Sequence, residues 1–141
     1  MTHLIDIALN INTLKKFYPL NRLPETQLQE VYRKSRLDHL SRHEILFREG
    51  SNDDDVIFLL RGTITLRTES GTVFELDSGA DQALYPIANI KPRRFSATIS
   101  SEHAAIARIS AKLIDQLMPK DRNIQVINNT LLTKDNSLLM L

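Results

Sequence analysis

The middle of the chain, Glu44–Ile109, constrains the fold most, because its apolar residues come in short segments separated by turns. Val56–Leu60 is a continuous apolar run, which suits a strand buried on both faces. Thr63–Arg67 and Thr72–Leu76 alternate with period two, and Gly71 lies in the turn between them. Short strands at such close spacing predict a sandwich, a jelly roll or a barrel.

The residues before this β segment predict helices as far as about Ser41. The segment Leu4–Phe17 is helix-like, and Pro19 is a break after it. A second helix is expected to start at Leu23–Glu25, where a proline near the first turn precedes an acidic residue. Apolar residues then recur at helical spacing: Leu28, Val31 and Tyr32.

The residues after the β segment also predict helix. Ser110 is a plausible N-cap, and Pro119 ends the helix that it begins. One apolar face is formed by Leu113, Ile114, Leu117 and Met118, and a further stripe by Ile124, Ile127 and Leu131. The chain ends on the apolar letters SLLML, which predict either a docked tail or the cut end of a larger protein.

Length and composition indicate one ordinary soluble domain of 141 residues. We divide it into an N-terminal helical segment (1–22), a β-roll with flanking helices (23–118) and a C-terminal helical tail (119–141), possibly truncated. The chain has no cysteine, which excludes disulfides, thiolate metal sites and cysteine nucleophiles. The net charge of +1 gives no support for bulk attraction to nucleic acid or membrane. We expect a cytoplasmic protein, because neither a secretory signal nor a membrane span is predicted.

An ordered set of motifs carries a resemblance to a known family. The stretch LFREGSNDDDVIFLLRGTITL has turn glycines at Gly50 and Gly62, with Asp54 four residues after the first. Leu76–Gly79 follows as an L-x-x-G pattern. Over about Pro24–Met118, the sequence resembles the cyclic-nucleotide-binding domain family, including effector domains of the catabolite-activator type. The resemblance implies a mainly β fold, an antiparallel β-roll or double-stranded jelly roll with flanking helices.

The resemblance also implies a phosphate-binding cassette after L-x-x-G, and here that cassette is degenerate. In the family, a short helix presents backbone N–H groups to the cyclic phosphate, and a glutamate accepts from the ribose 2′-OH. Gln82, Ala83 and Leu84 stand where the family has F-G-E. Leucine accepts no hydrogen bond, and Pro86 removes a backbone donor. Tyr85 either stacks on a base or packs under the loop, and we favour packing.

The family's phosphate arginine falls within PRRFSATI, but two counts place it differently. Counting forward from the cassette gives Arg93, whereas counting backward from Ala97 gives Phe95. Either Arg93 or Arg94 is therefore a candidate, with the hydroxyls of Ser96 and Thr98 following. A buried unpaired charge is costly, so both arginines are expected to point to solvent when no ligand is bound.

Other patterns favour structural roles. The triplet Asp53–Asp55 lacks the spacing of a calcium loop and is expected to be a solvated turn. His39 and His43 are four residues apart but lack a third ligand, so they are interpreted as surface histidines. No nucleophile elbow, phosphate-binding Walker loop or dinucleotide fingerprint is present. We therefore expect no enzyme, no metal and no resident cofactor.

The sequence favours a regulatory, non-catalytic sensor domain whose nucleotide binding is altered or lost. If a ligand binds, it is expected to be a cyclic nucleotide or another small anionic nucleotide. No direct nucleic-acid or membrane partner is expected. The C-terminal helix is the expected surface for a homodimer or for docking to another domain. Two alternatives stay open: a structural or protein-interaction module of a multidomain protein, and the effector domain of a truncated transcription regulator.

Overall fold

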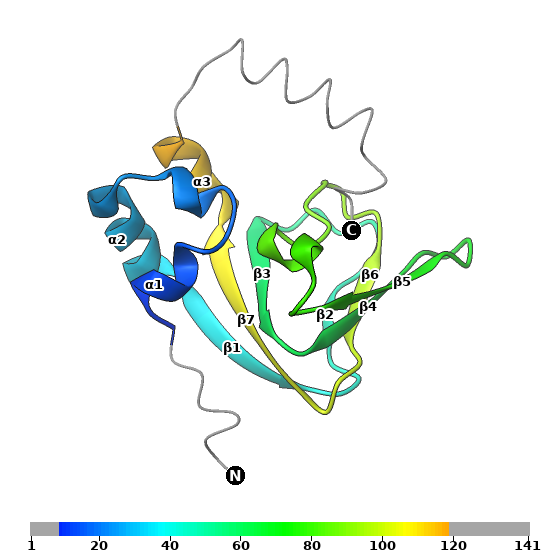
Figure 1. The fold of residues 1–141 in the computed structure, drawn as a ribbon. Helices are drawn as coiled ribbons and strands as arrows, with labels where there is room; N and C mark the ends of the chain where they lie inside the picture. The colour runs from blue at the N-terminus through cyan, green and yellow to red at the C-terminus, as the bar shows by residue number, and fades with distance from the viewer. Residues whose placement is uncertain (1–8, 119–141) are drawn as a thin grey trace.

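The computed structural model describes residues 9–118, which form two β-sheets and a layer of helices (Figure 1). The helical elements are α1 (Ile11–Leu14), η2 (Leu20–Arg22), α2 (Glu25–Lys34), η3 (Asp81–Leu84) and α3 (Ala111–Leu117). The strands are β1 (Arg36–Ser41), β2 (Ile45–Phe47), β3 (Asp55–Arg61), β4 (Thr63–Arg67), β5 (Val73–Asp77), β6 (Ser96–Ile99) and β7 (His103–Ser110).

The strands form a three-stranded sheet, β1-β7-β3, and a four-stranded sheet, β2-β6-β4-β5. All the pairings in both sheets are antiparallel. Helices α1, α2 and α3 lie together beside the three-stranded sheet, and the four-stranded sheet lies on the opposite side of the molecule (Figure 1). The predicted antiparallel β-roll with flanking helices is confirmed.

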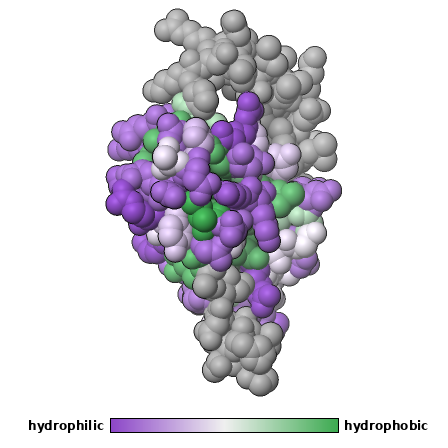
Figure 2. All heavy atoms as spheres, turned by 60° about the vertical axis from the view of Figure 1, so that its left-hand side comes forward, coloured by the Kyte–Doolittle hydropathy of each residue, from purple (hydrophilic) through white to green (hydrophobic). Residues whose placement is uncertain are grey.

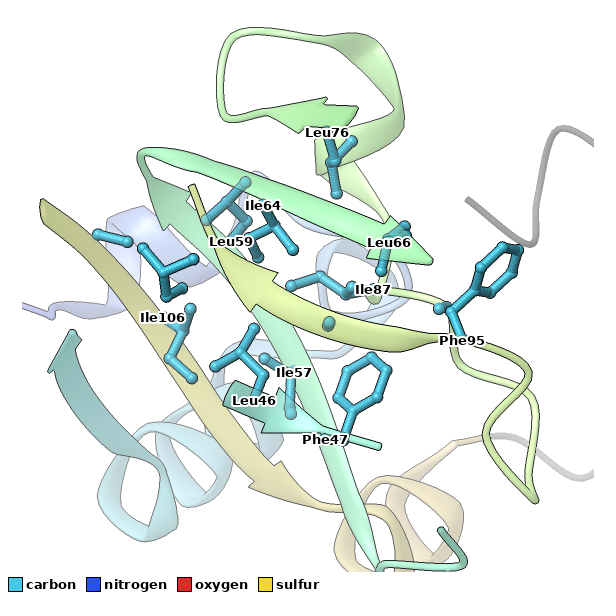
Figure 3. Packing of buried hydrophobic residues seen from close by; sticks show 14 of the residues in the cluster. Leu46, Phe47, Ile57, Leu59, Ile64, Leu66, Leu76, Ile87, Phe95 and Ile106 are labelled. Carbon is cyan, nitrogen blue, oxygen red and sulfur yellow. The ribbon is translucent and has the colours of Figure 1, made fainter. Parts of the chain in front are cut away.

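Strand β3 separates two hydrophobic cores. Val56 and Phe58 pack with the helices, whereas Ile57 and Leu59 pack inside the roll. Figure 3 shows the roll side of this arrangement, where Ile57 and Leu59 lie among other aliphatic side chains. The run Val56–Leu60 was predicted to be buried on both faces, and this is confirmed because the sheet that holds it is shared by both cores.

The predicted helix starts at Glu25 and Ser110 are also confirmed. Pro24 is the N-cap of α2 in an extended conformation, and Glu25 follows in the first turn. The Ser110 side chain accepts from the Leu113 N–H at 3.4 Å, which caps α3. Local residue chemistry was sufficient at these two positions: the Ser110 hydroxyl satisfies an N–H of its own helix, and Pro24 makes no side-chain cap but has a φ fixed by its ring.

The expectation that the helical zone continues to about Ser41 is wrong. Helix α2 ends at Lys34, and the Ser35 hydroxyl donates to the Tyr32 carbonyl at 2.7 Å. Arg36–Ser41 is strand β1, in register with β7 from Arg36 opposite Arg108 to Ser41 opposite His103. The partner of β1 is distant in sequence, so local periodicity could not reveal the pairing.

Several N- and C-terminal predictions extend beyond the part of the chain that is described. Of the segment Leu4–Phe17, the structure describes an α-helix at Ile11–Leu14. Residues 4–8, the stripe of Ile124, Ile127 and Leu131, and the SLLML end lie outside residues 9–118.

Within residues 9–118, no helix is long and apolar enough to cross a membrane. Seen from the helical side, the described surface is mainly hydrophilic (Figure 2).

The turn between β3 and β4 requires glycine for two reasons. Gly62 has φ of +107°, which side-chain-bearing residues rarely adopt. A Cβ at this position would lie 2.8 Å from the His103 carbonyl oxygen and from Ala104 Cβ. Gly71, in the β4–β5 turn, has a similar φ of +105° but open space around it.

We predict that Gly62→Ala lowers the free energy of unfolding by about 2–4 kcal/mol, because left-handed strain and overpacking add. Gly71→Ala is the matched control, and only the strain of about 1–2 kcal/mol applies there. Urea denaturation of both variants measures the difference. Equal losses would contradict the steric account of the β3–β4 turn.

Candidate functional site

The stretch Pro92–Ile99 continues the alternation of strand β6 backwards into the preceding loop. Its buried side chains are Arg93, Phe95, Ala97 and Ile99. The intervening Arg94 is exposed, and Ser96 and Thr98 are half-buried. Because successive side chains of an extended chain point to opposite faces, Arg93 enters the interior while Arg94 faces solvent.

The burial of Arg93 contradicts the expectation that both arginines point to solvent. Its relative exposure is only 1%, so the charge requires an internal partner. Asp53 supplies that partner from the loop between β2 and β3. Arg93 Nε donates to Asp53 Oδ2 at 3.0 Å, and Arg93 Nη2 donates to Asp53 Oδ1 at 2.7 Å. This bidentate geometry is the strong form of an arginine–carboxylate pair.

Main-chain carbonyls take the remaining donors of Arg93. Nη1 donates to the carbonyls of Ile87 at 3.2 Å and Ala88 at 3.3 Å. Nη2 also donates to the Asp55 carbonyl at 2.8 Å. A guanidinium has five N–H donors, and these five hydrogen bonds use all of them. The Phe47 ring covers the cation, with Cζ 4.0 Å from the ring centroid.

Lys91 reinforces the same contact between two loops. Its Nζ donates to the carbonyls of Asp53 at 2.7 Å and Asp55 at 3.0 Å, and lies 3.4 Å from Asp53 Oδ1. The backbone of Arg93 is fixed as well: its N–H donates to Ser51 O, and its carbonyl accepts from Gly50 N–H, both at 2.7 Å. The loop before β6 is therefore held against the β2–β3 loop by side chains and backbone together.

The carboxylate of Asp53 is stabilised in its charged form. Hydrogen bonding from the Arg93 guanidinium is the main cause that lowers the pKa of Asp53 far below its ordinary range. Partial burial opposes this shift, while the Asp55 backbone N–H and the charges of Arg93 and Lys91 add to it. Asp53 is therefore ionised at neutral pH and neutralises Arg93 without any bound anion.

The triplet Asp53–Asp55 was interpreted as a solvated turn; Asp54 is exposed as expected, but the interpretation is wrong for Asp53, which pairs with Arg93, and for Asp55, which begins β3. Asp54 accepts from the Ser110 hydroxyl at 3.1 Å, and its carbonyl accepts from Ala111 N–H at 2.8 Å. Asp55 Oδ2 lies 3.3 Å from Arg108 Nη1 on β7. Three consecutive aspartates thus contact three separate segments, and the partners that explain this are all distant in sequence.

The candidate cassette residues lie on and beside η3. Gln82 is exposed and Ala83 is buried, whereas the side chains of Leu84 and Tyr85 are 43% and 40% exposed. The Leu84 carbonyl accepts from Tyr18 N–H at 2.8 Å. The rings of Tyr18 and Tyr85 have centroids 5.6 Å apart, so Tyr85 contacts the helical layer while keeping one side open.

An apolar side chain occupies the other counted position of the arginine. Phe95 is 6% exposed and belongs to the hydrophobic core of the roll. Its ring meets that of Phe74 with centroids 5.7 Å apart. Ile87, from the loop that carries Arg93, lies in the same core and is labelled with Phe47 and Phe95 in Figure 3. Neither count therefore leads to an arginine side chain that is free inside the roll.

The two candidate residues with hydroxyl groups, Ser96 and Thr98, lie on the outer face of β6. Ser96 Oγ accepts from Glu49 N–H at 2.8 Å, and Thr98 lies opposite Thr65 on β4.

His39 is an exposed residue of β1, and His43 is exposed in the following turn with φ of 79°. Among residues 9–118, no group of three or more potential metal ligands is close enough to hold an ion.

Comparison with known proteins gives matches in structure only, since no protein-family model and no curated protein matches the sequence. The sensor domain of the transcriptional regulator DNR from Pseudomonas aeruginosa matches with a TM-score of 0.67 and 16% identity, over 89% of this chain and 91% of that one. The regulatory domain of Toxoplasma gondii PKA, crystallised with cAMP, matches with a TM-score of 0.62 and 15% identity, over 85% of this chain and 48% of that one.

A third match is the regulatory subunit of a cAMP-independent protein kinase A from Trypanosoma brucei. It has a TM-score of 0.64 and 11% identity, over 83% of this chain and 41% of that one. The fold is that of the cyclic-nucleotide-binding-like domains, as the sequence resemblance predicted. At these identities the likeness establishes the fold, and function must be argued from the site.

We predict that Arg93→Met lowers the free energy of unfolding by about 3–5 kcal/mol, because Asp53 loses its bidentate cation and the carbonyls of Ile87, Ala88 and Asp55 lose the Arg93 donors. The matched control is Arg94→Met, next in sequence but exposed, which is expected to change stability by less than about 0.5 kcal/mol. Guanidinium denaturation monitored by circular dichroism makes the comparison. Losses of the same size in the two variants would contradict the internal role of Arg93.

Proposed function

We propose that this chain is a regulatory, non-catalytic domain of the cyclic-nucleotide-binding-like type that works without holding a cyclic phosphate through Arg93. One observation carries the proposal: all five N–H donors of Arg93 already have partners within the protein. Asp53 provides the negative charge that a ligand phosphate would otherwise bring. The domain is then held in one arrangement by its own residues.

The energetics support this proposal. A phosphate that takes over Arg93 must displace Asp53 or the carbonyls, and disrupting a buried pair costs about 3–5 kcal/mol. That cost corresponds to a weakening of affinity by about two to four powers of ten. The loss of selectivity for ribose adds to it, because Leu84 offers no acceptor where the family has its glutamate.

The fold of the matched structures does not decide whether a cyclic nucleotide binds, because the matches include proteins of both kinds. One is a regulatory domain crystallised with cAMP, and another belongs to a kinase described as cAMP-independent. The proposal therefore rests on the contacts of Arg93 in this chain and not on its fold. The same argument leaves open a ligand that does not use Arg93, such as a small anionic nucleotide that approaches the exposed Arg94 or Tyr85.

A second candidate function is the sensor part of a transcription regulator. The match to the DNR sensor domain favours it, since nearly the full length of both chains is covered. Association through α3, as a homodimer or with another domain, stays a prediction. Leu113 and Ile114 of the expected association face pack within the chain's own core, and Leu117 is only partly buried.

We predict no heat of binding in calorimetric titrations of the full chain with cAMP, cGMP or cyclic dinucleotides up to about 1 mM, because Arg93 has no free donor. Titration of Arg93→Ala and Arg94→Ala completes the test. Micromolar binding that Arg93→Ala abolishes and Arg94→Ala preserves would contradict the proposal. Binding lost only in Arg94→Ala would locate an anion site outside the internal pair.

A further inference from the structure

The outer face of the sheet β2-β6-β4-β5 is separate from buried Arg93 and its partner Asp53. Leu66 on β4 and Phe47 on β2 both lie opposite Ala97 on β6, and all three side chains are buried. The residues one position away point outward, because side chains alternate along a strand. Arg67 lies opposite Ser96, and Arg48 follows Phe47 on the other side of β6.

Three arginines gather at this end of the sheet: Arg48, Arg67 and Arg94. Their nearness follows from Ser96, which pairs with Arg67, accepts from the residue after Arg48 and lies two residues after Arg94. All three are exposed, and within residues 9–118 none makes a side-chain hydrogen bond or ion pair. Elsewhere in the fold, arginines such as Arg36, Arg93 and Arg108 are paired with carboxylates.

Three carboxylates share this face and offset its charge: Glu49 and Glu69 at the arginine end, and Glu75 opposite Thr65 on β5. Glu49 Oε1 accepts from the Glu69 N–H at 2.8 Å, which directs that carboxylate to the β4–β5 turn. Within residues 9–118, none of these carboxylates forms an ion pair with an arginine. The three guanidinium groups therefore keep their donors available.

The rest of the face is uncovered by the described helices. Helices α1, α2 and α3 lie beside the other sheet (Figure 1). Half-buried hydroxyls, Thr65 and Thr98, occupy the centre of the face opposite one another. Branched apolar side chains mark its margins, with Ile45 on β2 exposed by 46% and Val73 on β5 by 48%.

We infer that this arginine surface, defined by Arg48, Arg67 and Arg94, binds an acidic segment of a partner protein. Arg48 and Arg67 flank β6, so their backbones are two strand spacings, about 10 Å, apart. Carboxylates three residues apart lie on one face of a peptide in the polyproline II conformation, with a similar separation of about 9 Å at 3.1 Å per residue. Each guanidinium fork then pairs with one carboxylate, while aliphatic groups contact Ile45 and Val73.

Charge and shape favour a peptide over nucleic acid. The net charge of the chain is +1, which gives no broad basic field for a phosphate backbone. The aromatic side chains next in sequence to Arg48 and Arg94, Phe47 and Phe95, are buried and offer no platform for stacked bases. The inference does not depend on whether a nucleotide binds near Arg93. The Arg93 side chain is buried in the interior, whereas Arg48, Arg67 and Arg94 are exposed.

The test uses a fluorescein-labelled peptide, four repeats of Glu-Ser-Ser, and its Gln-Ser-Ser counterpart, with anisotropy measured at low salt. We expect the full chain to bind the glutamate peptide, and the triple variant Arg48→Gln, Arg67→Gln, Arg94→Gln to bind it about tenfold more weakly. The matched control removes three exposed charges from the helical side: Lys16→Gln, Arg22→Gln, Lys112→Gln. It is expected to bind like the unmodified chain.

Three results would overturn the inference. The triple variant binds the glutamate peptide as well as the control does, or the full chain does not prefer glutamate to glutamine. In the third, a 20-nucleotide oligothymidine binds more tightly than the peptide and loses affinity in the triple variant, which would assign the arginines to nucleic acid. Equal unfolding midpoints of the two triple variants establish that the comparison concerns the surface and not the fold.

Discussion

The pairing of Arg93 with Asp53 is the constraint on which the loop before β6 depends. A cation with 1% exposure is tolerated only when its donors are satisfied, and here a carboxylate, three carbonyls and the Phe47 ring surround it. The neighbouring aspartates contact the start of α3 and strand β7, so the β2–β3 loop joins several parts of the domain. Under the proposed function, Asp53 supplies the negative charge that a ligand phosphate would otherwise bring.

Much of the fold could be predicted because local patterns determine it. The apolar run Val56–Leu60 fits a strand with a core on each face, and Ser110 caps α3 through its own hydroxyl. The order of glycine turns and strands between Gly50 and Gly79 was enough to indicate the cyclic-nucleotide-binding-like fold. Strand β1 was missed because Arg36–Ser41 is defined by its pairing with β7, which a local pattern does not contain.

The candidate site was less predictable, because its decisive contacts join distant residues. Asp53 and Arg93 are 40 positions apart, and neither has a distinctive neighbour that points to the other. One available indication was the alternation of PRRFSATI, since extending the inward series of Ile99, Ala97 and Phe95 by one step places Arg93 inside. The acidic triplet was the second indication: three adjacent charges in a turn between core strands need partners nearby.

The measurement that tests the internal role of Arg93 most directly is hydrogen exchange of the arginine Nε–H groups, followed by NMR with and without about 1 mM cAMP. The account predicts that the Arg93 Nε–H is protected, exchanges far more slowly than that of Arg94, and is unaffected by the nucleotide. Exchange as fast as that of Arg94, or a shift of the Arg93 signal when cAMP is added, would contradict the claim that Asp53 takes the place of a ligand phosphate.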